Sequence, residues 1–257
     1  MKARLPRIDD LDVAGRRVIV RCDLNVPLED GAITDDLRIR AAVPTLTRLI
    51  DRGARLAVCS HLGRPKGRVV EGLRLAAIGR RLRQLLKQSV TAVDEVVGET
   101  VQKACRSEEP IVLLENLRFE PGEERNDPAF ADALAALGDA YVDDAFGAAH
   151  RAHASIVGLA ERLPSAAGLL LIDEVTKLSG LLDDPQKPFV AVLGGAKVSD
   201  KLGIIGNLLG RTDSLCVGGA MAFTLLEARN ENVGRSLVEE DRVDEVRAVL
   251  GDADTRE

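Results

Sequence analysis

Six short apolar runs recur along this chain, and each one ends abruptly in a loop that is rich in glycine or charge. The runs cover residues 17–21, 55–58, 110–114, 140–144, 189–193 and 214–219. Their apolar residues follow one another instead of alternating with polar ones, which is typical of strands buried on both faces of a parallel sheet. This pattern restricts the fold strongly, because parallel strands need a crossover segment between them.

Helical patterns lie between these runs, at residues 43–53, 75–86 and 128–138. In the first pattern Leu46, Leu49 and Ile50 form one apolar stripe, and Gly53 is a favourable C-terminal residue. Pro44 either begins this helix or kinks it. Strands that alternate with helices predict a doubly wound α/β fold with right-handed crossovers.

The composition is that of a soluble globular protein with more than one domain, since the chain has 257 residues, of which 46% are hydrophobic and 30% charged. A net charge of -6 and an aromatic content of 2% argue against a nucleic-acid surface, which needs basic and stacking side chains. Any anion that the chain binds must therefore meet local positive charge.

We also expect a cytoplasmic protein that does not enter membranes. No charge-free run approaches the ~18 residues of a membrane span, and the N-terminus lacks the apolar stretch of a signal peptide. The cysteines form no C-x-x-C pair, so we interpret them as reduced core residues rather than as a redox or metal site. They are Cys22, Cys59, Cys105 and Cys216.

Cationic side chains follow the predicted strands at the points where these strands end. The loops carry His61, Arg64, Arg118, His150 and Arg151. Because ligands of open parallel sheets bind outside the carboxyl ends of the strands, we expect these loops to converge. Arg38 joins them at the start of a predicted helix, where a cation is unfavourable and needs an anion or full solvation.

Guanidinium groups bind phosphate and carboxylate through paired hydrogen bonds, so the expected ligand is a small, multiply charged anion. Asp23 and Asn25 follow the first predicted strand at the same edge of the sheet. A carboxylate in this place either orients a hydroxyl group of the ligand or simply balances charge. The first interpretation predicts a small hydroxylated acid phosphate.

The second half of the chain contains a different candidate phosphate-binding motif, "FVAVLGGAKVSDK" at residues 189–201. It runs a strand into Gly194-Gly195 and then places Lys197 and Lys201 four apart, on one face of the predicted helix that follows. Such a loop favours a polyphosphate, although a solvated helix face accounts for two lysines as well. Gly218-Gly219 lets a nucleotide base approach the main chain, or forms a tight turn.

With these motifs in place, the sequence resembles the phosphoglycerate kinase family. The matching stretches are "RCDLNVP" (21–27), "ITDDLRIRAAVPT" (33–45), "SHLGRP" (60–65), "LLENLRFEPGEE" (113–124), "VDDAFGAAHRAHAS" (142–155), "LGGAKVSDK" (193–201) and "GGAMAFTLL" (218–226). The resemblance implies two Rossmann-like domains with three-layer parallel sheets, joined by a helix. Here they are a substrate domain at 1–167, the helix at 168–184 and an incomplete nucleotide-binding domain at 185–257.

The resemblance also implies the site and the reaction, which transfers a phosphoryl group from 1,3-bisphosphoglycerate to ADP and gives 3-phosphoglycerate and ATP. The implied substrate-binding residues are Asp23, Asn25, Arg38, His61, Arg64, Arg118 and Arg151, and the implied nucleotide contacts are Gly195, Lys197, Lys201 and Gly219, with Mg²⁺ bound to ATP or ADP.

In the reverse reaction the acceptor carboxylate is already ionised at pH 7, so no general base is needed. Arg38 and Lys197 are then the expected catalytic residues, acting by charge stabilisation. Closure about the connecting helix would precede transfer.

The chain departs from the family pattern at two points. It ends at Glu257, whereas the family continues through a segment that carries a Mg-associated aspartate. It also has Ala220 at a position where the family often has glycine. We therefore expect a truncated chain that binds the acceptor, with catalysis by residues 1–257 alone in question.

A non-catalytic anion-binding module is the main alternative. A metal hydrolase built on His61, His150 and His153 is a weaker one, since acidic ligands at suitable spacing are missing. We expect a monomer that acts on small molecules.

Overall fold

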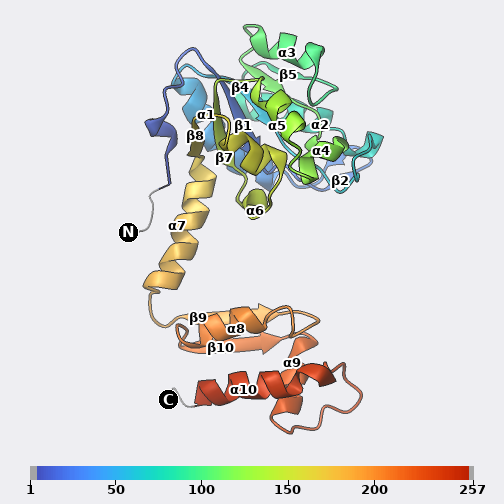
Figure 1. Ribbon diagram of the computed structural model, residues 1–257, viewed down its shortest axis with the longest axis vertical. Coiled ribbons are helices and arrows are strands. Elements are labelled where there is room, and N and C mark those ends of the chain that lie inside the picture. The colour runs from blue at the N-terminus through green and yellow to red at the C-terminus, as the bar shows by residue number, and fades with distance from the viewer. Residues whose placement is uncertain (1–4, 255–257) are drawn as a thin grey trace. The chain divides into compact units, whose positions relative to one another are not determined.

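The computed structural model describes residues 5–254, with side chains to residue 251 (Figure 1). The chain forms two compact units, and the boundary between them falls between Thr176 and Lys177. This boundary lies inside helix α7 (Leu169–Asp183), close to the helix predicted at 168–184. The division of the chain into domains at 167 and 185 stays a prediction.

The first unit is built on a six-stranded parallel sheet with the order β5-β6-β4-β1-β7-β8. Its strands are β1 (Arg17–Cys22), β4 (Arg55–Cys59), β5 (Val90–Ala92), β6 (Ile111–Leu113), β7 (Ala140–Asp144) and β8 (Ser165–Ala167). All six residues of β1 are buried, as the continuous apolar run predicts. The predicted α/β class with a parallel sheet is therefore confirmed.

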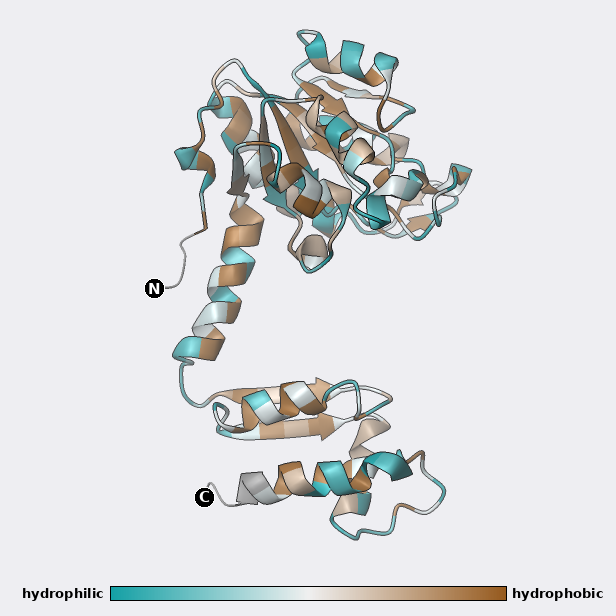
Figure 2. Ribbon diagram, in the orientation of Figure 1, coloured by the Kyte–Doolittle hydropathy of each residue, from teal (hydrophilic) through white to brown (hydrophobic). Residues whose placement is uncertain are grey.

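Alternate residues of the central strands enter two separate cores, one on each face of the sheet. Val18 and Val20 pack with residues of α1 and α2 in one core, whereas Ile19 packs with residues of α3 and α5 in the other. The helices are α1 (Leu37–Asp51), α2 (Ala76–Leu86), α3 (Glu99–Arg106), α4 (Pro121–Glu124), α5 (Pro128–Ala135) and α6 (Phe146–Ala149). Figure 2 shows the brown, hydrophobic strands between helices that carry teal residues. The result is a three-layer α/β unit.

Helix α1 begins six residues before the position that the sequence predicts. Its first turn is fixed at Asp35 and Asp36, because Asp35 Oδ1 accepts a hydrogen bond from the Leu37 backbone N–H (2.8 Å) and the Asp36 carbonyl accepts one from Arg40 (3.0 Å). Pro44 consequently lies inside the helix and does not begin it. Arg38 stands in the first turn, as expected.

A hairpin of two short antiparallel strands, β2 (Leu28–Glu29) and β3 (Ala32–Ile33), leads from β1 to helix α1. Its turn consists of Asp30 and Gly31, whose φ angles are 49° and 76°. Two successive positive φ angles are the geometry of a two-residue hairpin loop, which Asp-Gly favours.

Helix α7 starts against the end of strand β7. Asp144 Oδ1 accepts hydrogen bonds from the backbone N–H groups of Leu170 (2.9 Å) and Leu171 (3.3 Å), and Thr45 Oγ1 accepts one from Leu169 (2.9 Å). These contacts satisfy the first backbone donors of the helix. Gly168 leaves room for them, since a Cβ at this position would lie 2.1 Å from Asp144 Oδ1.

The second unit contains the parallel strands β9 (Val190–Gly194) and β10 (Ser214–Gly218) with helices α8 (Leu202–Leu209), α9 (Met221–Ala228) and α10 (Val243–Asp254). One face of the strand pair packs against a core around Ile205 and Met221. The other face is exposed, and Val192 is 77% exposed there. Cys216 lies on this exposed face, so its predicted place in a core is wrong, whereas Cys22, Cys59 and Cys105 are buried.

Within residues 5–254, no helix combines the length and the apolar character that crossing a bilayer requires.

Candidate anion-binding site

A cavity of about 250 Å³ opens at the carboxyl edge of the first unit's sheet. It is lined by Asp23, Asn25, Arg38, His61, Gly63, Arg64, Arg118, Gly147 and Arg151. The loops after β1, β4, β6 and β7 all reach it, and these four strands are neighbours in the sheet. The structure thus brings together all seven residues that the sequence places in a substrate site.

Two glycines that the sequence analysis does not single out complete the lining. Gly63 has a φ of +62°, and its N–H donates to Asn25 Oδ1 (2.9 Å) while its carbonyl accepts from Arg118 Nη1 (2.7 Å). A Cβ at Gly147 would lie 2.9 Å from Asp23 Oδ2. Both glycines lie inside the motifs quoted above, at 60–65 and 142–155, so these motifs are the sequence signal that could have identified them.

Buried Asn116 joins the loop after β4 to the loop after β6. Its Oδ1 accepts from the backbone N–H groups of Leu62 and Arg118 (both 3.1 Å), and its Nδ2 donates to the Leu62 carbonyl (2.8 Å). This side chain also caps the short 3₁₀ turn η3 (Leu117–Phe119) that carries Arg118. Asn116 therefore positions cavity residues without lining the cavity.

Asp23 and Arg38 form an ion pair at the cavity, between a partly buried carboxylate and an exposed guanidinium. Of the two roles that the sequence left open for Asp23, this contact favours charge balance. It also supplies the anion that a cation in the first turn of α1 requires.

Three further guanidiniums line the cavity. Arg118 is 6% exposed, and burial lowers its pKa, although an arginine stays protonated in proteins. Its Nε lies 3.2 Å from Glu124 Oε1. Among the described residues, Arg64 and Arg151 have no side-chain hydrogen bond or ion pair, so their donors are free for a ligand. Four guanidiniums and one carboxylate give this cavity a positively charged lining, which favours an anionic ligand.

His61 lies on the cavity floor and is 8% exposed. Burial lowers its pKa to about 2, and the nearby cations of Arg21, Arg118 and Arg151 act in the same direction. The imidazole is therefore neutral near pH 7. His150 is exposed and is not among the lining residues.

The second unit brings Gly195 and Gly219 together at the carboxyl ends of β9 and β10. A Cβ at Gly219 would lie 2.7 Å from the Gly195 carbonyl oxygen, and the φ of Gly219 is +74°. The same carbonyl accepts a hydrogen bond from the Met221 N–H (3.0 Å). The predicted nucleotide-contacting glycines are thus adjacent, and this close approach requires glycine at position 219.

The prediction that Lys197 and Lys201 share a helix face is wrong. Helix α8 begins only at Leu202, so Lys201 is its N-cap and Lys197 lies in the preceding loop. The physical reason is Glu239, whose carboxylate accepts hydrogen bonds from the N–H groups of Val198 (2.5 Å) and Ser199 (3.1 Å). These amides are held in a turn and do not continue a helix.

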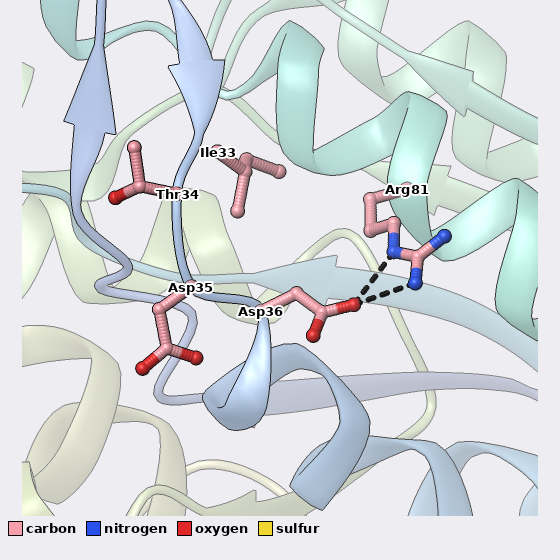
Figure 3. A pocket seen from close by; sticks show the side chains of 5 residues that line it. All are labelled: Ile33, Thr34, Asp35, Asp36 and Arg81. Atoms are coloured by element: carbon pink, nitrogen blue, oxygen red, sulfur yellow. Dashed lines mark hydrogen bonds and ion pairs between the residues drawn. The ribbon is translucent and has the colours of Figure 1, made fainter.

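A second hollow lies between the start of α1 and helix α2 (Figure 3). It is lined by Ile33, Thr34, Asp35, Asp36 and Arg81. Asp36 is paired there with Arg81 (2.7 Å) and with Arg40 (2.8 Å), and hydrogen bonds from both arginines lower its pKa. Its charge is neutralised within the protein, so this hollow is a weaker ligand site than the arginine-lined cavity.

In the part of the chain that the structure describes, no three histidine, cysteine or carboxylate side chains converge as metal ligands would. His153 contacts Glu123 (3.6 Å), and His61 contacts Arg21 (3.0 Å). These histidines are therefore engaged in a buried network and offer no support to a metal hydrolase.

Comparison with known proteins shows which family the chain is similar to. The family model for phosphoglycerate kinase matches residues 8–257. Curated phosphoglycerate kinases from Thermomicrobium roseum and Rubrobacter xylanophilus are 57% and 54% identical over 245 and 250 residues, which are 95% and 97% of this chain. The chain spans 62% and 64% of the length of these relatives.

Solved structures agree. The phosphoglycerate kinase of Coxiella burnetii superposes with a TM-score of 0.86 at 40% identity, over 98% of this chain and 64% of that one. The enzyme from Pyrococcus horikoshii OT3 gives a TM-score of 0.83 at 31% identity, over 96% of this chain and 65% of that one.

Proposed function

This chain belongs to the phosphoglycerate kinase family, and from that premise we propose that it takes part in phosphoryl transfer between 1,3-bisphosphoglycerate and ADP. The observation that carries the proposal is the cavity with four guanidiniums around a single carboxylate. A phosphorylated carboxylic acid needs several cationic donors, and guanidiniums provide them in pairs.

The acceptor, 3-phosphoglycerate, is proposed to bind in this cavity. Arg64 and Arg151 offer unpaired guanidiniums, and Arg118 offers a rigid one that is fixed through Gly63. Asn25 and neutral His61 add uncharged polar groups to the lining. Asp23 is paired with Arg38, and a hydroxyl group of the ligand would compete for the same carboxylate.

The chemistry asked of these residues is positioning and charge stabilisation. In the reverse direction, in which ATP is the donor, the carboxylate of 3-phosphoglycerate is ionised at pH 7, so it attacks without a general base. His61 is unsuited to acid–base work because its pKa lies far below 7. We assign to Arg38 the role of stabilising the charge on the transferring phosphoryl group, since its guanidinium is 53% exposed at the cavity and can leave Asp23 for a ligand.

The nucleotide is proposed to bind in the second unit, near Gly195, Lys197, Lys201 and Gly219. The two glycines place bare backbone at the ends of two neighbouring strands, and Lys197 is exposed beside them. Within the described residues no three carboxylate, histidine or cysteine side chains gather, so this loop holds no all-protein ligand set for Mg²⁺, which nucleotide sites commonly bind through one or two carboxylates and phosphate oxygens. We therefore derive no step through the metal.

Domain roles follow from these assignments. Residues 1–167 are proposed to bind the acceptor and residues 185–257 to belong to the nucleotide-binding part, with 168–184 as the connecting helix. A second function, acceptor binding without turnover, is supported by the position of the complete cavity within the first unit.

Calorimetric titration of the 257-residue chain with 3-phosphoglycerate, with and without MgATP, tests the proposal. Arg151→Ala is expected to weaken binding roughly 10- to 100-fold, because a charge-assisted hydrogen bond is lost. Arg125→Ala is the matched control, since Arg125 is exposed and does not line the cavity.

Formation of ADP from MgATP in the presence of 3-phosphoglycerate would support the kinase. Acceptor binding without ADP formation would favour the second function. If the unaltered chain shows no binding, or if both variants bind equally well, the proposed site is wrong.

A further inference from the structure

A buried polar chain lies beneath the cavity and ends at His61. At its centre is Arg21 of strand β1, which is 1% exposed. Its Nη2 lies 3.0 Å from His61 Nδ1, its Nε donates to Ser155 Oγ (3.0 Å), and its Nη1 donates to the Cys22 carbonyl (2.5 Å). The guanidinium therefore contacts the ring of His61, whereas Arg21 itself is not among the residues that line the cavity.

The far end of this chain is anchored by Glu123, which is completely buried. Ser155 donates to it twice, from Oγ to Oε1 (2.5 Å) and from the backbone N–H to Oε2 (3.0 Å). Burial alone would raise the pKa of Glu123, but the nearby His153 ring, the charge of Arg21 and the hydrogen bonds from Ser155 outweigh it and lower the pKa. Glu123 is thus an anion that balances the buried charge of Arg21.

The chemistry of the two groups decides where the imidazole hydrogen lies. A guanidinium carries only donors and does not lose its proton, so His61 Nδ1 must accept the hydrogen bond through its lone pair. A neutral imidazole has one N–H, and that hydrogen is then on Nε2. Because Nδ1 is occupied by Arg21, Nε2 is the ring nitrogen that remains available to the cavity.

We propose that Arg21 is a positioning residue that fixes His61 as the neutral tautomer protonated at Nε2, so that His61 presents an N–H donor to an oxygen atom of a bound anion. The role toward the anion rests on the proposed function, whereas the tautomer does not. His61 then selects for ligand oxygens that accept hydrogen bonds. An amide or hydroxyl hydrogen in the same place would leave two donors facing each other.

The surroundings of His61 hold it in this state. Charged or titratable groups face it or its cavity from each neighbouring element, namely Arg21, Asp23, Arg38, Arg64, Arg118, Arg151 and His153. Cations outnumber carboxylates among them, so a second proton on the ring would meet repulsion. A pKa of about 2 for His61 agrees with this arrangement, and we expect no protonation of the ring between pH 5 and 8.

Nitrogen-15 NMR of the whole chain with labelled histidine tests the tautomer without any ligand. The chain has only three histidines, and His61→Gln identifies the His61 signals. The expected spectrum shows a neutral ring with its hydrogen on Nε2 that does not change from pH 5 to 8. A cationic ring, a ring protonated at Nδ1 or a mixture of the two tautomers would overturn the proposal.

The role of Arg21 is tested with Arg21→Met, which removes the donor, and Arg21→Gln, whose amide can accept as well as donate. Both are expected to release His61 into a tautomer mixture or to make it titrate, and to weaken 3-phosphoglycerate binding roughly 10- to 100-fold, because His61 no longer presents its charge-assisted hydrogen bond to the anion. Arg17→Met is the control, because Arg17 is a buried arginine of the same strand whose guanidinium donates only to backbone carbonyls.

A His61 spectrum that is unchanged in both Arg21 variants would overturn the positioning role. If Arg21→Met does not fold, Arg21→Gln and the spectrum of the unaltered chain still decide the question. An Nε2-protonated His61 in a chain that does not bind 3-phosphoglycerate would support the tautomer and contradict the proposed function.

Discussion

Asp144 caps helix α7 through Leu170, whose backbone nitrogen lies 2.9 Å from Asp144 Oδ1. The other carboxylate oxygen of Asp144 is buried and has no hydrogen-bond partner among the residues that the structure describes. Burial raises the pKa of Asp144 to about 7, although hydrogen bonds from Thr45 and the helix amides act in the opposite direction. The side chain that caps the start of helix α7 is therefore expected to change its charge near neutral pH.

This cap predicts a pH-dependent stability. The folded state keeps the proton of Asp144 up to about pH 7, whereas an unfolded aspartate loses it near ~3.9. The contribution of this group is therefore present at low pH and is lost as the pH rises toward 7, by about 1.4 kcal/mol per pH unit at most. Denaturant unfolding of the unaltered chain and of Asp144→Asn at pH 5, 6 and 8 measures it. The stability difference should shift in favour of Asp144→Asn as the pH rises, and parallel pH profiles would contradict the prediction.

Arg38→Ala is expected to separate catalysis from binding. In a form of this protein that carries out phosphoryl transfer, kcat should fall on the order of 10³-fold, because the charge on the transferring group loses its guanidinium. The Kd for 3-phosphoglycerate should rise much less. Arg40→Ala in the same helix is the control, since Arg40 pairs with Asp36 away from the cavity. Equal losses in kcat and affinity would mean that Arg38 only binds.

Gly219→Ala should destabilise the second unit. The new Cβ would lie 2.7 Å from the Gly195 carbonyl oxygen at a φ of +74°, which together cost roughly 1–3 kcal/mol of unfolding free energy. Gly218→Ala is the matched control, because a Cβ there meets nothing within 4 Å. Thermal unfolding of both variants measures the difference in stability. Similar midpoint temperatures would contradict the close approach of Gly219 to the Gly195 carbonyl.

Glu239→Gln should loosen the loop that carries Lys197. Hydrogen bonds from Ser199 lower the pKa of Glu239, so its stabilisation is present at neutral pH and is lost as the pH falls through this lowered pKa. The amides of Val198 and Ser199 should then exchange their hydrogens faster at pH 7 than in the unaltered chain. Glu240→Gln, at the exposed neighbouring residue, should leave their exchange unchanged. Equal exchange in both variants would argue against the cap.

Much of the fold and of the candidate site could be predicted from local sequence. The strands β1, β4, β6 and β7 read as continuous apolar runs because each is buried on both faces. The edge strands β5 and β8 are not predicted, since their sequences, VTA and SAA, lie at the margins of the sheet and form no continuous apolar run of the kind that a strand buried on both faces shows. Site residues such as Arg64 and Arg118 were accessible because parallel strands deliver their following loops to one edge.

The tertiary structure alone decided how those residues are held. Arg21 meets Ser155 across 134 positions of sequence, and Glu239 takes the amides of Val198 and Ser199 from about 40 positions away. No periodicity or spacing encodes such pairs, because hydrogen bonds depend on where the fold places two groups and not on their separation along the chain. The sequence by itself determined the buried central strands and the edge of the sheet that carries the cationic loops. Packing determined the ionisation, the tautomer and the local conformation of the side chains there.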